Sequence, residues 1–281
     1  PNLRLYQEIG EDSWKQLNPQ FHKIYAKTLP NEKAVYYVGM IQACLSELRN
    51  NQDVKSSLKA LERIASSDFL ATFNSDAVKK AFWVNAYNVF NLVGLKRSQP
   101  KSFWARWRHF SRRDYRVAGI RLSLNDIEHG ILRRSKFWWA AGWLRNPLPQ
   151  RIMLATQLDN DDPRIHFALN CGANGCPAIR FYTATGVEEE LHLATKAFFD
   201  LEVQSQMGVI WVSGIFKMYL GDFGGKRGLK NWIQRYRSDL EIGKMPVRFR
   251  AYDWKINLDK FAEWSNSGNG SHHFVATMPS I

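Results

Sequence analysis

This chain has few cysteines, no long apolar run and no visible sequence repeat, and each absence excludes a class of protein. Three cysteines in 281 residues are too few for a scaffold held together by disulfides. No stretch approaches the roughly 18 consecutive apolar residues that cross a bilayer as a helix. The beginning of the sequence, PNLRLYQEIGEDSWKQ, lacks the charged and then apolar pattern of a signal peptide, which favours a cytoplasmic location. An apolar content of 45% excludes wholesale disorder.

Acidic residues are scarce in one part of the chain. Residues 96–151 hold fourteen Lys or Arg against three Asp or Glu, a net charge of +11, and the other 225 residues carry only +2. Five of the eleven tryptophans lie in the same segment. Cations interleaved with aromatic rings suit nucleic acid or an anionic membrane surface. The alternative is a solvated insertion whose tryptophans pack on the core while arginine stems cover apolar surface.

The first half of the chain is predicted to be helical, and the second half mixes helices with strands. The predicted helices are 31–50, 53–66, 75–96, 185–204 and 228–236. The predicted strands are 164–170, 208–214 and 247–258. This order favours an α+β fold, with a helical N-terminal half packed on a small, mostly antiparallel sheet. No linker is visible, so residues 1–281 are expected to form a single domain, with a loose tail at 266–281.

Three asparagines interrupt the most apolar of these helices. The segment 75–96 is apolar nearly all round, which is typical of a buried helix. Asn85, Asn88 and Asn91 recur in it at intervals of three and therefore share one stripe. Two interpretations stay open: the buried amides pair with neighbouring backbone, as buried polar groups must, or the stripe faces a polar pocket.

A short helix is expected within RLSLNDIEHGILRRS. Ser123 is a suitable N-cap, and Asp126 stands three residues on, in the capping-box position. Glu128 lies at the edge of the inward face. His129 and Arg133 are four residues apart and share one side of the helix.

The run RIHFALNCGANGCPAIR concentrates the residue types that carry chemistry. His166 lies in a predicted strand, and the glycine-rich turn after it holds Cys171 and Cys176. As nucleophiles, these thiols need a base, which His166 or His129 can supply with Glu128 as the orienting acid. The same pair can instead hold zinc, close a local disulfide in an oxidising compartment, or be structural. Zinc usually needs a second pair of ligands and none is evident, so no metal is predicted.

Two other strings are weaker candidates. GDFGGKRG is glycine-rich and basic, but it lacks the spacing and the Ser or Thr of a phosphate-binding P-loop, and a turn is predicted. The acidic stretch LDNDDP lacks the EF-hand pattern and is predicted to be a solvated loop.

Four motifs occur together in an order that resembles a known family. They are AFWVNAYN, LSLNDIEHGILR, DPRIHFALNCGANGCPAIRFYTA and AYDWKINL. In this combination the chain resembles bacterial members of the family called domain of unknown function 547, over residues 75–258. Plant members carry the domain behind a coiled coil and resemble interaction proteins. The activity of the family is unsettled, so the resemblance predicts the family and not the reaction.

The resemblance singles out a set of residues. On this sequence the family motifs fall on Asn85, Asn88, Glu128, His129, Arg133, Arg164, His166, Cys171, Gly172, Cys176, Pro177, Tyr252, Asp253 and Trp254. This set includes the candidates found from spacing, which favours one site that holds Glu128, His129, His166 and a cysteine. In papain- and transglutaminase-type thiol enzymes the cysteine precedes its histidine. Here the histidines come first, so only a permuted or unrelated arrangement fits.

The combined hypothesis is a thiol-dependent enzyme, a cysteine-dependent hydrolase or transferase, that acts on a small anionic or peptide-like substrate. The predicted catalytic residues are Cys171, Cys176, His166, His129 and Glu128. The predicted substrate-binding residues are Asn85, Asn88, Arg133 and Arg164. No cofactor is predicted, and the basic residues around Glu128 favour an anionic ligand. The alternative is a non-catalytic binding or scaffold module that uses the basic, Trp-rich face on nucleic acid, anionic lipid or a protein partner.

Overall fold

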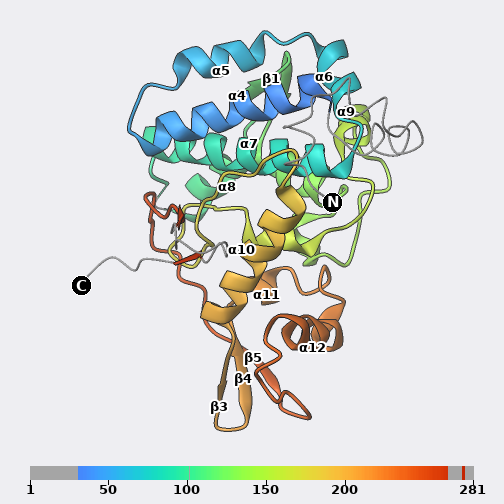
Figure 1. Ribbon diagram of the computed structural model, residues 1–281, viewed down its shortest axis with the longest axis vertical. Coiled ribbons are helices and arrows are strands. Elements are labelled where there is room, and N and C mark those ends of the chain that lie inside the picture. The colour runs from blue at the N-terminus through green and yellow to red at the C-terminus, as the bar shows by residue number, and fades with distance from the viewer. Residues whose placement is uncertain (1–30, 101, 265–273, 276–281) are drawn as a thin grey trace, which may run out of the picture.

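Four helices build the N-terminal part of the molecule. The computed structural model describes residues 31–100, 102–264 and 274–275. The four helices are α4 (Glu32–Arg49), α5 (Lys55–Glu62), α6 (Ser66–Thr72) and α7 (Asp76–Arg97). Figure 1 shows α4 and α7 side by side in the upper part of the molecule, with α5 along the outer side of α4.

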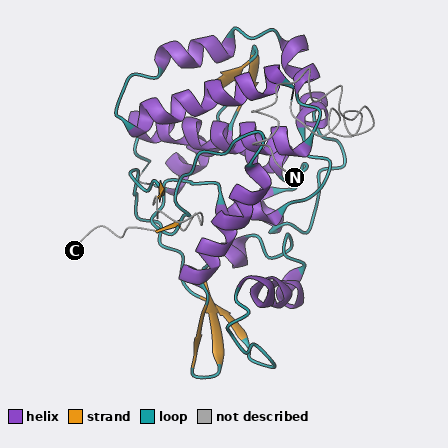
Figure 2. Ribbon diagram, in the orientation of Figure 1, coloured by secondary structure: helices purple, strands orange, loops and turns teal. Residues whose placement is uncertain are grey.

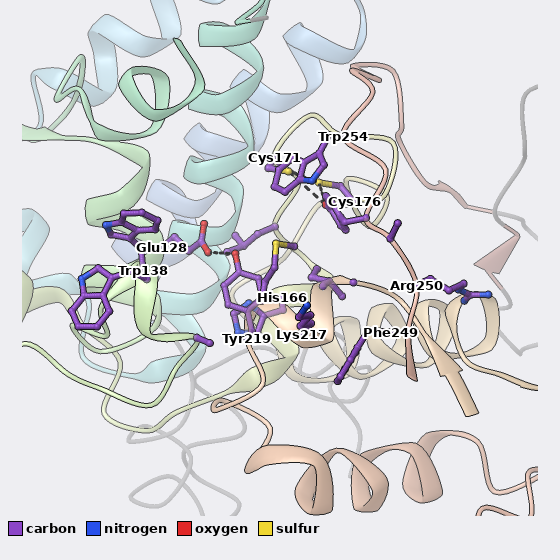
Figure 3. Close-up of a pocket in the computed structure, with 18 of the residues that line it drawn as sticks. Glu128, Trp138, His166, Cys171, Cys176, Lys217, Tyr219, Phe249, Arg250 and Trp254 are labelled. Atoms are coloured by element: carbon purple, nitrogen blue, oxygen red, sulfur yellow. Dashed lines mark hydrogen bonds between the residues drawn. The ribbon is translucent and has the colours of Figure 1, made fainter. Parts of the chain in front are cut away.

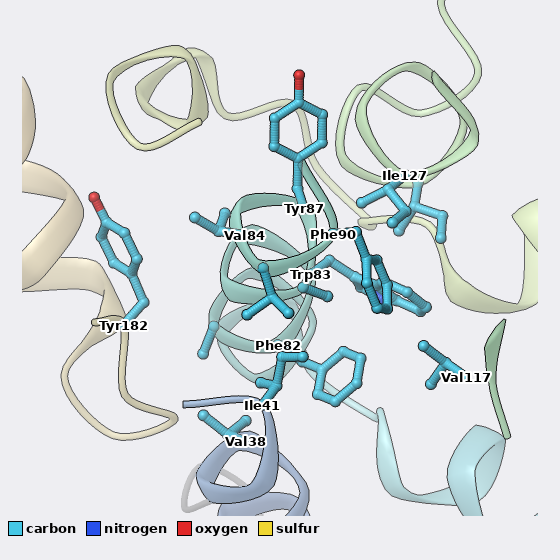
Figure 4. Close-up of a cluster of buried hydrophobic side chains, with 14 of the residues drawn as sticks. Val38, Ile41, Phe82, Trp83, Val84, Tyr87, Phe90, Val117, Ile127 and Tyr182 are labelled. Carbon is cyan, nitrogen blue, oxygen red and sulfur yellow. The ribbon is translucent and has the colours of Figure 1, made fainter. Parts of the chain in front are cut away.

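Helix α7 forms the centre of the larger hydrophobic core. Nearly all of its side chains are buried, which confirms the buried helix predicted from its apolar sequence. Phe82 and Trp83 pack edge to face with ring centroids 5.1 Å apart, and Phe69 of α6 contacts both rings. Figure 4 shows Phe82 and Trp83 within this cluster. Ser75 caps the helix by accepting a hydrogen bond from the Val78 N–H.

A second core lies under a mixed three-stranded sheet. The elements around it are α10 (Val187–Glu202), β3 (Gln204–Gln206), β4 (Val209–Val212), α11 (Ile215–Met218), α12 (Gly225–Tyr236) and β5 (Val247–Phe249). Strands β3 and β4 pair antiparallel, whereas β4 and β5 pair parallel. Phe167, Phe199, Phe216 and Phe223 fill the core between them. Figure 2 shows this sheet at the end of the molecule opposite α5.

The remaining elements are short. They are α8 (Phe103–Ser111), β1 (Tyr115–Val117), β2 (Ile120–Leu122), η1 (Asp126–Leu132), η2 (Trp138–Ala140), α9 (Arg151–Thr156), η3 (Pro163–Phe167), β6 (Glu263–Trp264) and β7 (Phe274–Val275). Strand β1 pairs with β2 and β6 with β7, both antiparallel, so the described strands are divided among three small sheets. The α+β class is confirmed.

Two predicted strands are wrong in whole or in part. Residues 164–170 begin as the 3₁₀ helix η3, because Asp162 accepts a hydrogen bond from the Arg164 N–H and a proline follows it at the first helical position. Both sides of this segment are buried, so its alternating pattern did not mark a half-exposed strand. Of the strand predicted at 247–258, only β5 is regular. The rest is held by isolated pairing, as between Ile256 and Ala173.

Element η1 is a wide-turned π-helix with the expected capping box. The Ser123 N–H donates to the Asp126 carboxylate at 3.0 Å, and the Asp126 N–H donates to the Ser123 hydroxyl at 3.0 Å. Further along, the Arg133 N–H reaches back five residues to the Glu128 carbonyl. π-Helical turns occur often at functional sites, and this one carries Glu128 and His129.

The asparagine stripe fastens the cysteine-containing segment to α7. Asn85 bonds to both the N–H and the carbonyl of Tyr182. Asn88 donates to the Ala168 carbonyl and accepts from the Asn170 N–H. The structure therefore supports pairing of the amides with backbone, and the buried groups are satisfied.

Two further points concern the predicted C-terminal tail and the length of the helices. Apart from residues 274–275, the tail predicted at 266–281 lies outside the described residues. Within the part of the chain that the structure describes, no helix has both the length and the apolar character needed to cross a membrane.

Candidate functional site

One large cavity brings the predicted catalytic residues together. Its volume is about 1490 Å³, and Figure 3 shows part of its wall. The residues that line it include all five predicted catalytic residues: Cys171, Cys176, His166, His129 and Glu128. They come from η1, η3 and the turn that follows η3. Small-molecule sites typically measure roughly 300–1,000 Å³, so this cavity has room for an extended ligand.

Cys171 and Cys176 are in direct contact. Their Sγ atoms are 2.8 Å apart. The Cys171 N–H donates to the Cys176 sulfur at 3.0 Å, and the Tyr252 hydroxyl lies 3.0 Å from the same sulfur. The segment after β5 holds the turn in place, since the Asn174 N–H donates to the Lys255 carbonyl at 2.7 Å.

These contacts drive the pKa values of the two thiols apart. Burial opposes ionisation of Cys176, but hydrogen bonds from the Cys171 thiol, the Tyr252 hydroxyl and main-chain N–H groups lower its pKa to about 7. The shared hydrogen bond, together with burial, raises the pKa of Cys171 well above its usual value. Burial raises the pKa of Cys44, on the buried face of α4, to about 12. The chain therefore has one thiol suited to nucleophilic attack.

Glu128 is a buried carboxylate kept in its charged form. The Tyr219 hydroxyl donates to its Oε1 at 2.7 Å. Burial opposes ionisation, but His129, Arg133 and the bond from Tyr219 hold the pKa of Glu128 below its usual value. Figure 3 shows the Glu128–Tyr219 bond at the wall of the cavity.

His129 is neutral and presents a proton on one known nitrogen. The Arg133 guanidinium, which can only donate, lies 2.6 Å from His129 Nδ1. Nδ1 is therefore the acceptor, and the proton of the neutral ring is on Nε2. Burial, together with the charge of Arg133, lowers the pKa of His129 to about 4. At neutral pH this ring acts as a hydrogen-bond donor rather than as a base.

Asp222 connects three buried side chains of the site by hydrogen bonds. Its carboxylate accepts hydrogen bonds from Arg133 Nε at 2.8 Å, Lys136 Nζ at 2.6 Å and His166 Nε2 at 2.7 Å. The bond and charge of His166 and the charge of Arg133 outweigh burial and hold the pKa of Asp222 far below its usual range. His166 also stacks on the Tyr219 ring, with centroids 3.8 Å apart. Burial lowers the pKa of His166, so its Nδ1 is unprotonated at neutral pH.

Sequence reasoning missed Asp222 and Tyr219. Asp222 lies in GDFGGKRG, which was predicted to be a turn only, and Tyr219 carries no motif signal. The turn that carries Asp222 packs closely against Gly142. A Cβ atom added to Gly142 would lie only 2.3 Å from the Asp222 carboxylate. No local sequence pattern predicts a contact between positions so far apart.

The expected pairing of a thiol with a histidine is not observed. Among the described residues, no imidazole hydrogen-bonds to Cys171 or Cys176, and Tyr252 takes that place. The physical reason is that His129 is engaged by Arg133 and His166 by Asp222. Figure 3 shows the thiols and the Glu128–His166 group on different parts of the cavity wall.

The predicted substrate-binding residues lie outside the cavity lining. Asn85 and Asn88 bond to backbone, as described above. Arg133 positions His129 and Asp222 from behind the wall. Arg164 forms a bidentate pair with Asp162 and a further ion pair with Glu188. These residues stabilise the site's surroundings.

The basic segment does not form a uniform positive surface. Half of its fourteen cations pair with carboxylates among the described residues: Arg112, Arg113, Arg116, Arg133, Arg134, Lys136 and Arg145. Its five tryptophans are 49–73% exposed, which does not support the alternative in which these rings pack on the core. Trp107, Trp138 and Trp139 line the large cavity.

Fold and site together define a class: an α+β protein with a thiol pair and a buried cluster of His, Glu, Asp and Arg around one cavity. Residues 71–199 match the family described as "Protein of unknown function, DUF547", and this part of the chain belongs to that family. The match contains three of the four motifs. The fourth, at 251–258, lies beyond it, although its Tyr252 contacts the thiols. Comparisons with curated proteins and with solved structures found no match.

Proposed function

We propose that this protein is a thiol-dependent enzyme, a hydrolase or transferase, in which the Cys176 thiolate attacks the carbonyl group of a small anionic or peptide-like substrate. The supporting observation is the thiol pair in the cavity wall, where hydrogen bonds from Cys171 and Tyr252 favour the thiolate of Cys176. The thiolate is the nucleophilic form of cysteine. With a pKa of about 7, about half of the Cys176 side chains are in this form at neutral pH.

Tyr252 and the histidine-rich part of the wall offer the other groups that such a reaction needs. When the sulfur bonds to the carbonyl carbon, the C=O electron pair moves to oxygen, and the Tyr252 hydroxyl, which lies 3.0 Å from the Cys176 sulfur, is the candidate donor to that oxyanion. The bond to the leaving group then breaks, and the leaving group takes the bonding electrons and a proton from water. Attack by water or another acceptor on the S-acyl cysteine restores the thiolate. His166, oriented by Asp222, is the candidate base for this second attack.

The pH dependence of alkylation tests the proposal. The rate of carboxamidomethylation of the native protein by iodoacetamide is expected to rise tenfold per pH unit below pH 7 and to level off above it, because only the thiolate reacts. The urea-unfolded chain serves as the control, with an expected midpoint of about 8.5. Mass spectrometry of the peptides locates the modified residue. A native midpoint equal to that of the unfolded chain would exclude an activated thiol.

A second candidate is a non-catalytic module that docks on an anionic membrane. The exposed tryptophans of the basic segment favour it, because Trp prefers the membrane interface. Co-sedimentation with vesicles that contain phosphatidylserine is then expected to fall steeply with salt, whereas neutral phosphatidylcholine vesicles serve as the control. Equal recovery with both kinds of vesicle, or binding to duplex DNA alone, counts against this candidate.

A further inference from the structure

We infer that the mouth of the cavity binds a phosphate-bearing end of the substrate, held by Lys217, Lys226 and Arg248. The inference rests on the proposed function only for the reacting end of the substrate, at Cys176. The three cations come from different elements, namely α11, α12 and β5, and all of them line the same cavity as the thiols.

The charges that line this cavity are strongly unbalanced. Glu128 is the one carboxylate among the residues that line it. The basic lining residues number five: Arg106, Lys217, Lys226, Arg248 and Arg250. Glu128 already accepts a hydrogen bond from the Tyr219 hydroxyl. A cavity with one sign of charge focuses the field and concentrates ligands of the opposite sign.

Two of the five cations already have partners. Arg106 donates to the Trp254 carbonyl at 3.1 Å and lies over the Trp254 ring. Arg250 forms an ion pair with Glu202 at 3.3 Å. Glu202 therefore compensates the charge of Arg250, whereas Arg106 keeps its charge but is fixed against the cavity wall by its neutral partners.

The other three cations have no such partner. In the described part of the chain, no carboxylate or carbonyl accepts a hydrogen bond from the side chains of Lys217, Lys226 or Arg248, and all three are exposed. This distinguishes them from Lys136 and Arg145 of the basic segment, whose charges Asp161 compensates. Figure 3 shows Lys217 at the cavity.

The chemistry of the occupant follows from the charge and shape of the cavity. A single carboxylate would offset one of three like charges, whereas a phosphate monoester or diphosphate carries two or three negative charges and accepts several hydrogen bonds. Trp138, Trp139 and Trp211 also line the cavity and offer apolar, stacking surfaces. The volume of about 1490 Å³ suits an elongated molecule with a phosphate end at the mouth and a reactive carbonyl at the thiols.

Calorimetric titration with inorganic diphosphate tests the site. The wild type is expected to bind it at low salt, and the Lys217→Ala/Lys226→Ala/Arg248→Ala variant to bind at least about tenfold more weakly. The matched control is Lys59→Ala/Arg63→Ala/Arg121→Ala, which removes three exposed cations away from the cavity lining. Wild-type affinity in the cavity variant, an equal loss in the control, or absence of wild-type binding overturns the inference.

Alkylation rates separate this inference from the proposed enzyme function. Iodoacetate is anionic and iodoacetamide neutral, and both react with the same thiolate. The rate with iodoacetate divided by the rate with iodoacetamide, both measured at Cys176, is expected to fall several-fold in the cavity variant. This ratio is expected to stay constant in the control variant. An unchanged ratio overturns the link between the mouth and the thiols. Diphosphate binding without any reaction of Cys176 would instead reject the proposed thiol chemistry and leave the anion site supported.

Discussion

Replacement of Cys176 by alanine is expected to lower the alkylation rate of the native protein at pH 7 by roughly tenfold and to move its midpoint toward pH 9. Without Cys176, the remaining cavity thiol is Cys171, whose pKa is raised chiefly by its hydrogen bond with Cys176. Once relieved of that partner, Cys171 returns toward an ordinary thiol, with about 1–3% thiolate at pH 7. The greater intrinsic reactivity of a thiolate with a higher pKa offsets part of the loss, which leaves the net tenfold effect.

Two other cysteine variants complete this experiment. Cys171→Ala keeps Cys176 but removes one hydrogen bond to its sulfur, so a reactive thiol with a somewhat higher pKa is expected. Cys44→Ala is the matched control, because Cys44 is fully buried and its pKa is raised to about 12. If Cys171→Ala, and not Cys176→Ala, removed the fast reaction, the assignment of the nucleophile would be reversed.

Asp222→Ala is expected to lower the free energy of unfolding by about 3–5 kcal/mol. The substitution leaves Arg133, Lys136 and His166 without the buried carboxylate that accepts their hydrogen bonds. Lys136 keeps an ion pair with Asp161, so it loses less than Arg133 does. For a chain of this size the loss corresponds to a fall of roughly 10 °C in the melting temperature, which differential scanning calorimetry measures.

The control for Asp222 is an exposed carboxylate with cationic partners. Asp200 contacts Lys196 and Arg237 at the surface, so Asp200→Ala is expected to cost less than about 1 kcal/mol. Asp222→Asn keeps the shape and one acceptor oxygen but loses the negative charge and the second acceptor, so an intermediate loss is expected. Equal melting temperatures for Asp222→Ala and the wild type would contradict a structural role for the buried network.

The helices were largely predictable because their determinants are local. Helix α7 followed from an apolar segment that begins at Ser75, and the capping box of η1 followed from Ser123 and Asp126. Residues 164–170 were mispredicted because alternation of side chains indicates a strand only where one face is exposed, and both faces of this segment are buried.

The candidate site was half predictable. His166, Glu128 and the two cysteines stand in recognisable motifs, and the structure brings them to one cavity. Their actual partners, Tyr219 and Asp222, were missed because they follow the motifs by some fifty to ninety residues in sequence. Contacts of that range depend on how α11 and the turn before α12 pack against η1 and η3.

The amino-acid sequence by itself determined the family of residues 71–199, the helical first half and the concentration of positive charge at residues 96–151. Only the tertiary structure decided which of those charges are available to a ligand. A count of charges along the chain is local, whereas compensation depends on carboxylates brought close by folding, such as Asp161 and Asp222. Ion pairs engage half of the basic segment, whereas the three cavity-lining cations without a hydrogen-bond partner, Lys217, Lys226 and Arg248, lie far outside this segment in the sequence.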